Sequence, residues 1–123
     1  MRIATPLLAL LITACATAGG TGSSRDPSVL TQEEIVEANQ LNVLDLIRSD
    51  RPHWLRIRGS TSLTQEPEIR VYLDGVHAGG VEMLADIATI NVEEIHYYDA
   101  RQAQYRFGVG HVQGAIEVIT KRD

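Results

Sequence analysis

Apolar and polar residues alternate along several short segments in the second half of the chain. In the clearest of them, Ile69, Val71 and Leu73 fall on one face of a strand, because strand side chains alternate with a period of two. Asp74-Gly75 follows at once, and this dipeptide is a strong signal for a hairpin turn. We expect four strands, which are Ile69–Leu73, Val76–Ala78, Glu93–Asp99 and Ala115–Thr120.

Helix-start and helix-stop signals occupy the first half of the chain. Thr31 and Glu34 have the spacing of a capping box, so a helix begins there. Asn42 followed by Asp45 is a second start signal, and Pro52 ends that second helix because the residue before a proline avoids the helical region. We expect two short helices, at residues 32–38 and 43–49.

Three further segments complete the expected fold. The apolar residues of Val81–Ile87 repeat with helical spacing, which predicts an amphipathic helix laid across the sheet, and Ala100–Tyr105 is expected to form a helical turn. His53–Gly59 alternates from Leu55 onward and predicts a short extended segment, with Trp54 covering one end of the core. The pattern indicates an α+β fold with a small mixed sheet of about four strands and short helices.

The first fifteen residues carry a different pattern. Met1-Arg2 is a short positive start, and Ile3–Ile12 is an apolar run of about ten residues, as in a signal peptide. The run is too short to cross a hydrocarbon core of about 30 Å, which takes about 20 apolar residues as a helix. Leu11–Cys15 looks like a bacterial lipobox, which predicts cleavage between Ala14 and Cys15 and lipidation of the Cys15 thiol.

The alternative is a conventional secretory peptide cleaved near Ala16–Ala18. Cys15 is the only cysteine of the chain, so it cannot form an intrachain disulfide, and a free thiol would be unusual in an oxidising compartment. Lipidation accounts for it, and two or three acyl chains would anchor the protein stably. In lipoproteins of this kind an Asp after the cysteine tends to retain the protein in the inner membrane, so Ala16 implies the outer membrane by resemblance.

The segment after Cys15 has the composition of a linker. Residues 16–28 are rich in Gly, Ser and Thr and lack periodic apolar positions, so they form a flexible tether with a reach of roughly 20 Å. A chain of 123 residues leaves room for one folded unit beyond it. We therefore divide the chain into a signal peptide (1–14), a lipidated tether (15–28) and a folded domain (29–123).

Five motifs follow one another in a fixed order in the second half of the chain: Ile69–Val76 (IRVYLDGV), Leu84–Ile87, Val92–Ile95, Tyr105–Gly108 and Gly114–Lys121 (GAIEVITK). Their order resembles the plug domain of TonB-dependent outer-membrane receptors, with Thr31–Gly59 as a looser match. A complete receptor continues into a barrel of many strands, whereas this sequence ends at Asp123, and residues 16–28 do not look like a TonB box. The resemblance thus implies a plug-like fold that stands alone, without transport or energy coupling of its own.

Charge and motif content argue against several classes of function. From Cys15 onward the chain has 10 basic and 16 acidic residues, a balance that disfavours nucleic acid as a partner. The four histidines show no metal-binding spacing, and we expect His77 and His111 to be surface loop groups and His96 to lie on the polar face of its strand. Adjacent strand residues Glu93 and Glu94 point to opposite faces, which excludes them as a catalytic pair. We expect no enzyme activity, no metal and no cofactor.

The aromatic residues near the carboxyl end supply the candidate contact surface. Its members are Tyr98, Tyr105, Gly108, Gly110 and His111, and Tyr98 and Tyr105 are the leading candidates if both are exposed. The sequence therefore favours a non-enzymatic lipoprotein, lipid-anchored in the cell outer membrane and facing the periplasm, that binds a barrel or receptor protein and is accessory to TonB-dependent uptake. Strand addition to an uncovered sheet edge, expected at Ala115–Thr120, is one route to such a partner.

A second interpretation keeps the export signal but changes the class of ligand. In this alternative the chain is a stand-alone periplasmic protein that holds a chelate or a peptide in the glycine-rich loops Gly75–Gly80 and Gly108–Gly114.

Overall fold

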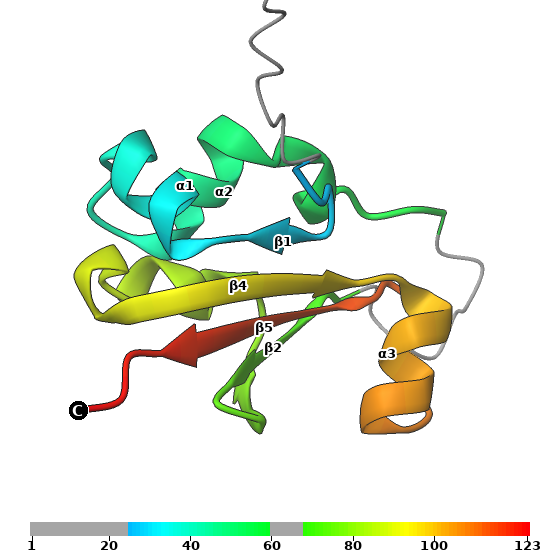
Figure 1. Ribbon diagram of the computed structural model, residues 1–123. Helices are drawn as coiled ribbons and strands as arrows, with labels where there is room; N and C mark the ends of the chain where they lie inside the picture. The colour runs from blue at the N-terminus through cyan, green and yellow to red at the C-terminus, as the bar shows by residue number, and fades with distance from the viewer. Residues whose placement is uncertain (1–24, 60–67) are drawn as a thin grey trace, which may run out of the picture.

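The computed structural model describes residues 25–59 and 68–123 (Figure 1). The predicted cleavage site at Ala14 and Cys15, the part of the tether before residue 25, and residues 60–67 lie outside the described residues. Among the described residues, no helix is long and apolar enough to cross a membrane.

Five strands form one mixed sheet in the order β1-β4-β5-β2-β3. Strand β2 pairs in parallel with β5, while β1 with β4, β4 with β5 and β2 with β3 are antiparallel. The strands are β1 (Val29–Leu30), β2 (Arg70–Leu73), β3 (Val76–Gly79), β4 (Val92–Tyr98) and β5 (Ala115–Thr120). The expected α+β fold with a mixed sheet and short helices is confirmed, with β1 as an unexpected fifth strand.

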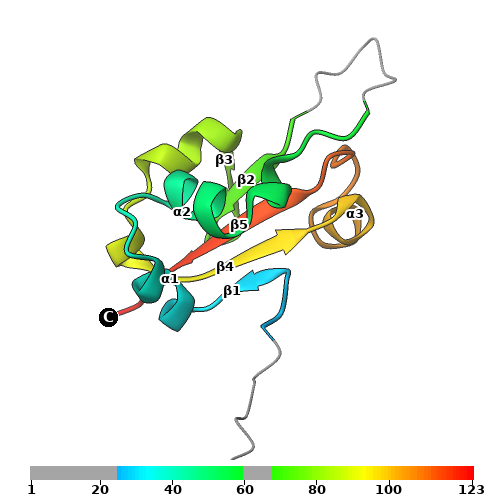
Figure 2. The same ribbon diagram turned by 90° about the horizontal axis from the view of Figure 1, so that it is seen from above.

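The prediction that Ala115–Thr120 is an uncovered edge is wrong. Strand β5 lies in the middle of the sheet, between β4 and β2, and its first four residues are all buried. A chain-terminal strand can still be central, because pairing order depends on long-range packing and not on position in the sequence. The two edges of the described sheet are instead β1 and β3 (Figure 2).

The main core lies on one face of the sheet, beneath α1 (Gln32–Ala38) and α2 (Val43–Asp50) (Figure 1). Trp54 is fully buried in this core, stacks on Tyr97 with ring centroids 5.6 Å apart, and donates its indole N–H to the Pro27 carbonyl at 3.0 Å. Other fully buried members come from both layers and include Leu30, Leu46, Ile47, Ile69, Val71, Leu84, Ile95 and Ile116.

The two predicted N-caps form as expected. The Thr31 side chain accepts a hydrogen bond from the Glu34 amide and Glu34 reaches back to the Thr31 amide, while Asn42 accepts from the Asp45 amide at 2.9 Å. Helix α1 ends at Asn39, whose φ of 52° places it in the left-handed region that asparagine tolerates. Both helix predictions are confirmed to within a residue.

Three local predictions differ from the structure. Pro52–Leu55 forms a 3₁₀ helix, η1, because proline suits the first turn of a helix, and 56–59 form no strand, so the extended segment expected at His53–Gly59 is wrong. Val81–Asp86 (η2) is also a 3₁₀ helix, so the prediction of a helix in this segment is correct, but the helix is not an α-helix. Helix α3 (Ala100–Phe107) is two turns long because Asp99 and Gln102 form a second capping box that extends the expected turn.

Glu34 joins the start of α1 to the end of α2. Its carboxylate lies 3.1 Å from the Arg51 guanidinium, and both side chains are largely buried. Burial opposes ionisation of Glu34, but hydrogen bonds from Thr31 and Arg51 outweigh it and hold the pKa of Glu34 below its ordinary value of 4.5. A lowered pKa in the folded state means that ionised Glu34 stabilises the fold above about pH 4.5, and that this contribution is lost as the pH falls through the folded-state pKa.

We therefore expect Glu34→Gln to lower the free energy of unfolding by about 1 kcal/mol at neutral pH. The difference from wild type should shrink in denaturant unfolding as the pH is lowered from 4.5 through the depressed folded-state pKa of Glu34, because the carboxylate that distinguishes the two proteins is then lost. Glu33→Gln is the matched control, since Glu33 is an exposed carboxylate of the same helical turn. A Glu34→Gln deficit that stays constant with pH would show that the carboxylate charge has no part in it.

Candidate interaction surface

Helix α3 covers one end of the sheet, on the side away from α1 and α2 (Figure 1). Its buried Ala103 packs with Tyr72 and Ala115 of the sheet, and Phe107 at its end stacks on Tyr72 with ring centroids 3.8 Å apart. The Tyr98 ring meets Phe107 edge to face at 5.6 Å. This second, smaller core fixes α3 against the sheet and therefore positions every side chain on its outer surface.

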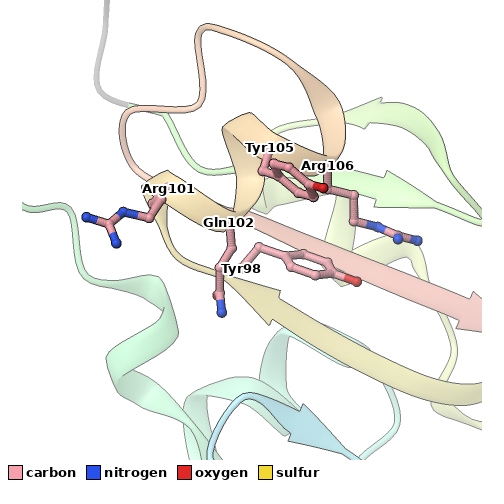
Figure 3. A pocket seen from close by; sticks show the side chains of 5 residues that line it. All are labelled: Tyr98, Arg101, Gln102, Tyr105 and Arg106. Carbon is pink, nitrogen blue, oxygen red and sulfur yellow. The ribbon is translucent and has the colours of Figure 1, made fainter.

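Tyr98 and Tyr105 line one open depression of about 650 Å³ beside α3, together with Arg101, Gln102 and Arg106 (Figure 3). Tyr105 is 95% exposed, whereas Tyr98 is half-buried. Burial raises the pKa of Tyr98, and the nearby Glu117 carboxylate adds to that rise, so the phenol keeps its proton at neutral pH. The structure thus brings together the two leading residues of the predicted contact surface.

Arg106 is held in place by a buried carboxylate. Its guanidinium donates to both oxygens of Glu117, at 3.0 and 3.3 Å, and the Glu117 side chain on β5 is only 4% exposed. The same guanidinium lies 5.4 Å from the centroid of the Tyr98 ring. The hydrogen bond with Glu117 raises the pKa of Arg106 above its ordinary value, and the arginine stays charged. Sequence patterns missed Glu117, which reads only as one charge within an apolar strand.

His111 is not part of the surface, and its interpretation as an exposed loop group is wrong. The side chain is buried, with Nδ1 2.7 Å from the Gly108 carbonyl oxygen and Nε2 2.6 Å from the Tyr72 hydroxyl. A carbonyl can only accept, so Nδ1 donates its N–H to Gly108, and the second ring nitrogen, Nε2, shares a hydrogen bond with the Tyr72 hydroxyl. Gly108 and Gly110 have φ values of 100° and 99° and curve the chain around this imidazole.

The Tyr72 to His111 hydrogen bond is testable by removing one hydroxyl. Tyr72→Phe leaves the buried Nε2 atom without its hydrogen-bond partner, which should lower the free energy of unfolding by about 1 to 3 kcal/mol. Tyr105→Phe makes the same chemical change at an exposed ring and should alter stability by less than about 0.5 kcal/mol. Denaturant unfolding followed by circular dichroism measures both, and equal small losses would mean that the bond contributes nothing to folding.

The exposure of His77 and the position of His96 agree with the predictions, but His77 lies on a strand and not in a loop. His77 is exposed on β3, and His96 is half-buried on β4 with its Nε2 atom 3.0 Å from a Glu94 oxygen. Within the part of the chain that the structure describes, no three His, Cys, Asp or Glu side chains are grouped to hold a metal ion.

A second depression, of about 280 Å³, adjoins the first through the shared residue Arg101. Its lining includes Arg56, Arg58, Tyr97, Asp99 and Val112. The Gln113 side chain holds the 56–59 segment in place, because its oxygen accepts from the Arg58 amide at 2.8 Å and its nitrogen donates to the Arg58 carbonyl at 2.5 Å. These two bonds mimic a strand pairing between residues 55 apart in sequence, which no local pattern reveals.

The glycine-rich loops of the alternative interpretation are occupied by contacts within the chain. Asp74 and Gly75, at φ values of 49° and 85°, form the β2–β3 turn, and the Asp74 carboxylate accepts from the Thr120 amide at 2.9 Å. The loop at Gly108–Gly114 is filled by the His111 imidazole. No observation on either loop therefore favours a small-molecule site.

No family model and no curated protein matches this sequence. Among solved structures, the chain is similar to the siderophore receptor PiuA from Acinetobacter baumannii, with a TM-score of 0.50 and 18% sequence identity. The similarity covers 77% of this chain and 15% of the receptor, so the chain matches a small part of that protein's length. At this level of identity the comparison shows a shared fold, and it agrees with the plug-like fold that the sequence motifs imply.

Proposed function

We propose that this chain is a lipid-anchored protein of the outer membrane whose plug-like domain binds a barrel or receptor protein and is accessory to TonB-dependent uptake. The observation that carries the proposal is the fold shared with a siderophore receptor over 77% of the chain. The lipobox at Leu11–Cys15 supports anchoring, and Ala16 after the cysteine supports the outer membrane as the destination. The depression around Tyr98 and Tyr105 supports binding over catalysis, because it offers aromatic and cationic contacts without a nucleophile and base in reach of each other.

The binding role can be tested by photocrosslinking in intact envelopes. A photoreactive phenylalanine analogue at Tyr105 should give a discrete adduct with an outer-membrane protein. The matched control carries the same group at Ile90, which is 76% exposed but belongs to neither depression. Adducts of equal yield and identity from both positions, or none from Tyr105, would contradict the proposal.

The anchoring role has an independent test. Mass spectrometry of the mature amino terminus should find acyl chains on Cys15, and Cys15→Ser should abolish incorporation of a labelled fatty acid and release the protein from the membrane fraction. Cys15→Ser leaves every described residue unchanged, so the released protein should keep the fold. An unmodified terminus near Ala16–Ala18 would instead establish the conventional secretory peptide.

A further inference from the structure

We propose that the two adjoining depressions form one docking surface for an acidic segment of a partner protein that carries an aromatic or aliphatic side chain. This arginine surface consists of Arg56, Arg58, Arg101 and Arg106 around Tyr98 and Tyr105. The inference rests on the proposed function and deepens it, because it names the place of contact and the chemistry of the partner.

The local charge of the arginine surface is opposite to that of the whole chain. The sequence has a net charge of −5, yet the two depressions are lined by four arginines and one carboxylate, Asp99. Asp99 is already used as the N-cap of α3, where it accepts from the Gln102 amide at 2.8 Å. Glu117 pairs with Arg106, so among the described residues the excess positive charge of the surface lies at Arg56, Arg58 and Arg101, and electrostatic complementarity selects an acidic partner.

The arginines differ in how they are held. Arg56, Arg58 and Arg101 are exposed and have no ion-pair partner within residues 25–59 and 68–123, whereas Arg106 is fixed against Glu117. Gln113 fixes the backbone of Arg58 through two hydrogen bonds, so the segment that carries Arg56 and Arg58 has a defined position. Exposed guanidinium groups on a fixed backbone suit bidentate contacts with carboxylates.

The apolar groups of the surface favour a protein over a lipid headgroup layer. Tyr105 is 95% and Val112 54% exposed, and each lines one of the two depressions. Tyrosine and arginine together are typical of the residues that dominate protein interfaces. The charges line two concave depressions on either side of Arg101, a shape that receives side chains projecting from a peptide better than a flat layer of headgroups.

The test uses the mature lipidated protein in a non-ionic detergent and short fluorescent peptides. One peptide combines Asp and Glu with a central Phe, a second replaces the acids with Asn and Gln, and a third replaces the Phe with Gly. We expect the first to bind at least about tenfold more tightly than either of the others, as measured by fluorescence anisotropy. Its affinity should fall as salt is raised, because exposed charges are screened.

Matched double variants separate the arginine surface from net charge. Arg56→Gln with Arg101→Gln should weaken binding of the acidic peptide about tenfold. The control variant, Arg48→Gln with Arg122→Gln, removes the same charge from residues outside both depressions. It should change the affinity for the acidic peptide by less than about twofold. Equal effects of the two variants, equal affinity for the neutral peptide, or binding of anionic vesicles in preference to the peptide would each overturn the inference.

The crosslinking experiment distinguishes this inference from the proposed function. If wild type gives an adduct at Tyr105 and the Arg56→Gln, Arg101→Gln variant gives the same yield, the partner does not use the arginine surface and the proposed function stands. If wild type gives no adduct, the proposed function itself fails.

Discussion

Gly114→Ala should lower the free energy of unfolding by about 3 to 5 kcal/mol, which is a large part of the stability of a small domain. Gly114 precedes β5, and its φ of 87° is strained for any residue with a Cβ atom. A Cβ added there would overlap the backbone carbonyl oxygen of Tyr98 and lie 3.4 Å from the Tyr97 hydroxyl. The carbonyl belongs to β4, which pairs with β5 at this point, so it cannot move aside without breaking the sheet.

Gly75→Ala separates the two parts of this cost. Gly75 has nearly the same φ, 85°, but a Cβ atom there would meet nothing within 4 Å, so only the backbone strain of about 1 kcal/mol remains. Denaturant unfolding of both variants should therefore rank Gly114→Ala as much the more harmful. Comparable losses in the two variants would mean that β4 and β5 do not approach each other at Gly114 as the structure shows.

Helix caps and the hairpin turn could be predicted from the sequence, because each of these signals involves residues only a few positions apart. The Thr31 and Glu34 capping box, the Asn42 cap and the Asp74-Gly75 turn all form where they were predicted. The positions of β2, β4 and β5 were also predicted correctly, although the first four residues of β5 are all buried, because each face of the sheet is covered by a core there.

Strand pairing and contacts between distant parts of the chain could not be predicted from such local signals. Two-residue β1 has no periodicity of its own and is a strand only because Val29 and Leu30 pair with β4. The central place of β5 follows from its contacts with β2 and β4, and its position near the chain end suggested the opposite. His111 looked like a loop residue because it stands between glycines, and its burial depends on Tyr72, 39 residues earlier.

The sequence predicted only the part of the candidate surface that depends on residues close together in the chain. Tyr98 and Tyr105 are seven positions apart, on either side of the α3 cap, and their proximity follows from one short strand-to-helix connection. The approach of Arg56 and Arg58 depends on the Gln113 bonds to a distant segment, and the fixing of Arg106 depends on Glu117 from a central strand. In the sequence alone, these charged residues cannot be told from ordinary surface residues, because only the fold brings them together.

Trp54→Ala should also cost about 3 to 5 kcal/mol of unfolding free energy, because it removes the largest fully buried side chain of the domain. The indole stacks on Tyr97 and donates to the Pro27 carbonyl, so its loss opens a cavity and leaves that carbonyl without its donor. Trp54 is the only tryptophan, and the unfolding must therefore be followed by circular dichroism and not by tryptophan fluorescence.

The Pro27 bond gives Trp54→Ala a second, local consequence. Pro27 directly precedes the Ser28–Leu30 segment that holds β1 on β4, so loss of the indole should free this segment and speed proteolysis near residue 27. His53→Ala removes the exposed neighbouring ring and should change both stability and proteolysis little, by less than about 0.5 kcal/mol. Equal proteolysis rates in Trp54→Ala and wild type under native conditions would show that β1 stays on the sheet without the indole, and that packing alone accounts for the role of Trp54.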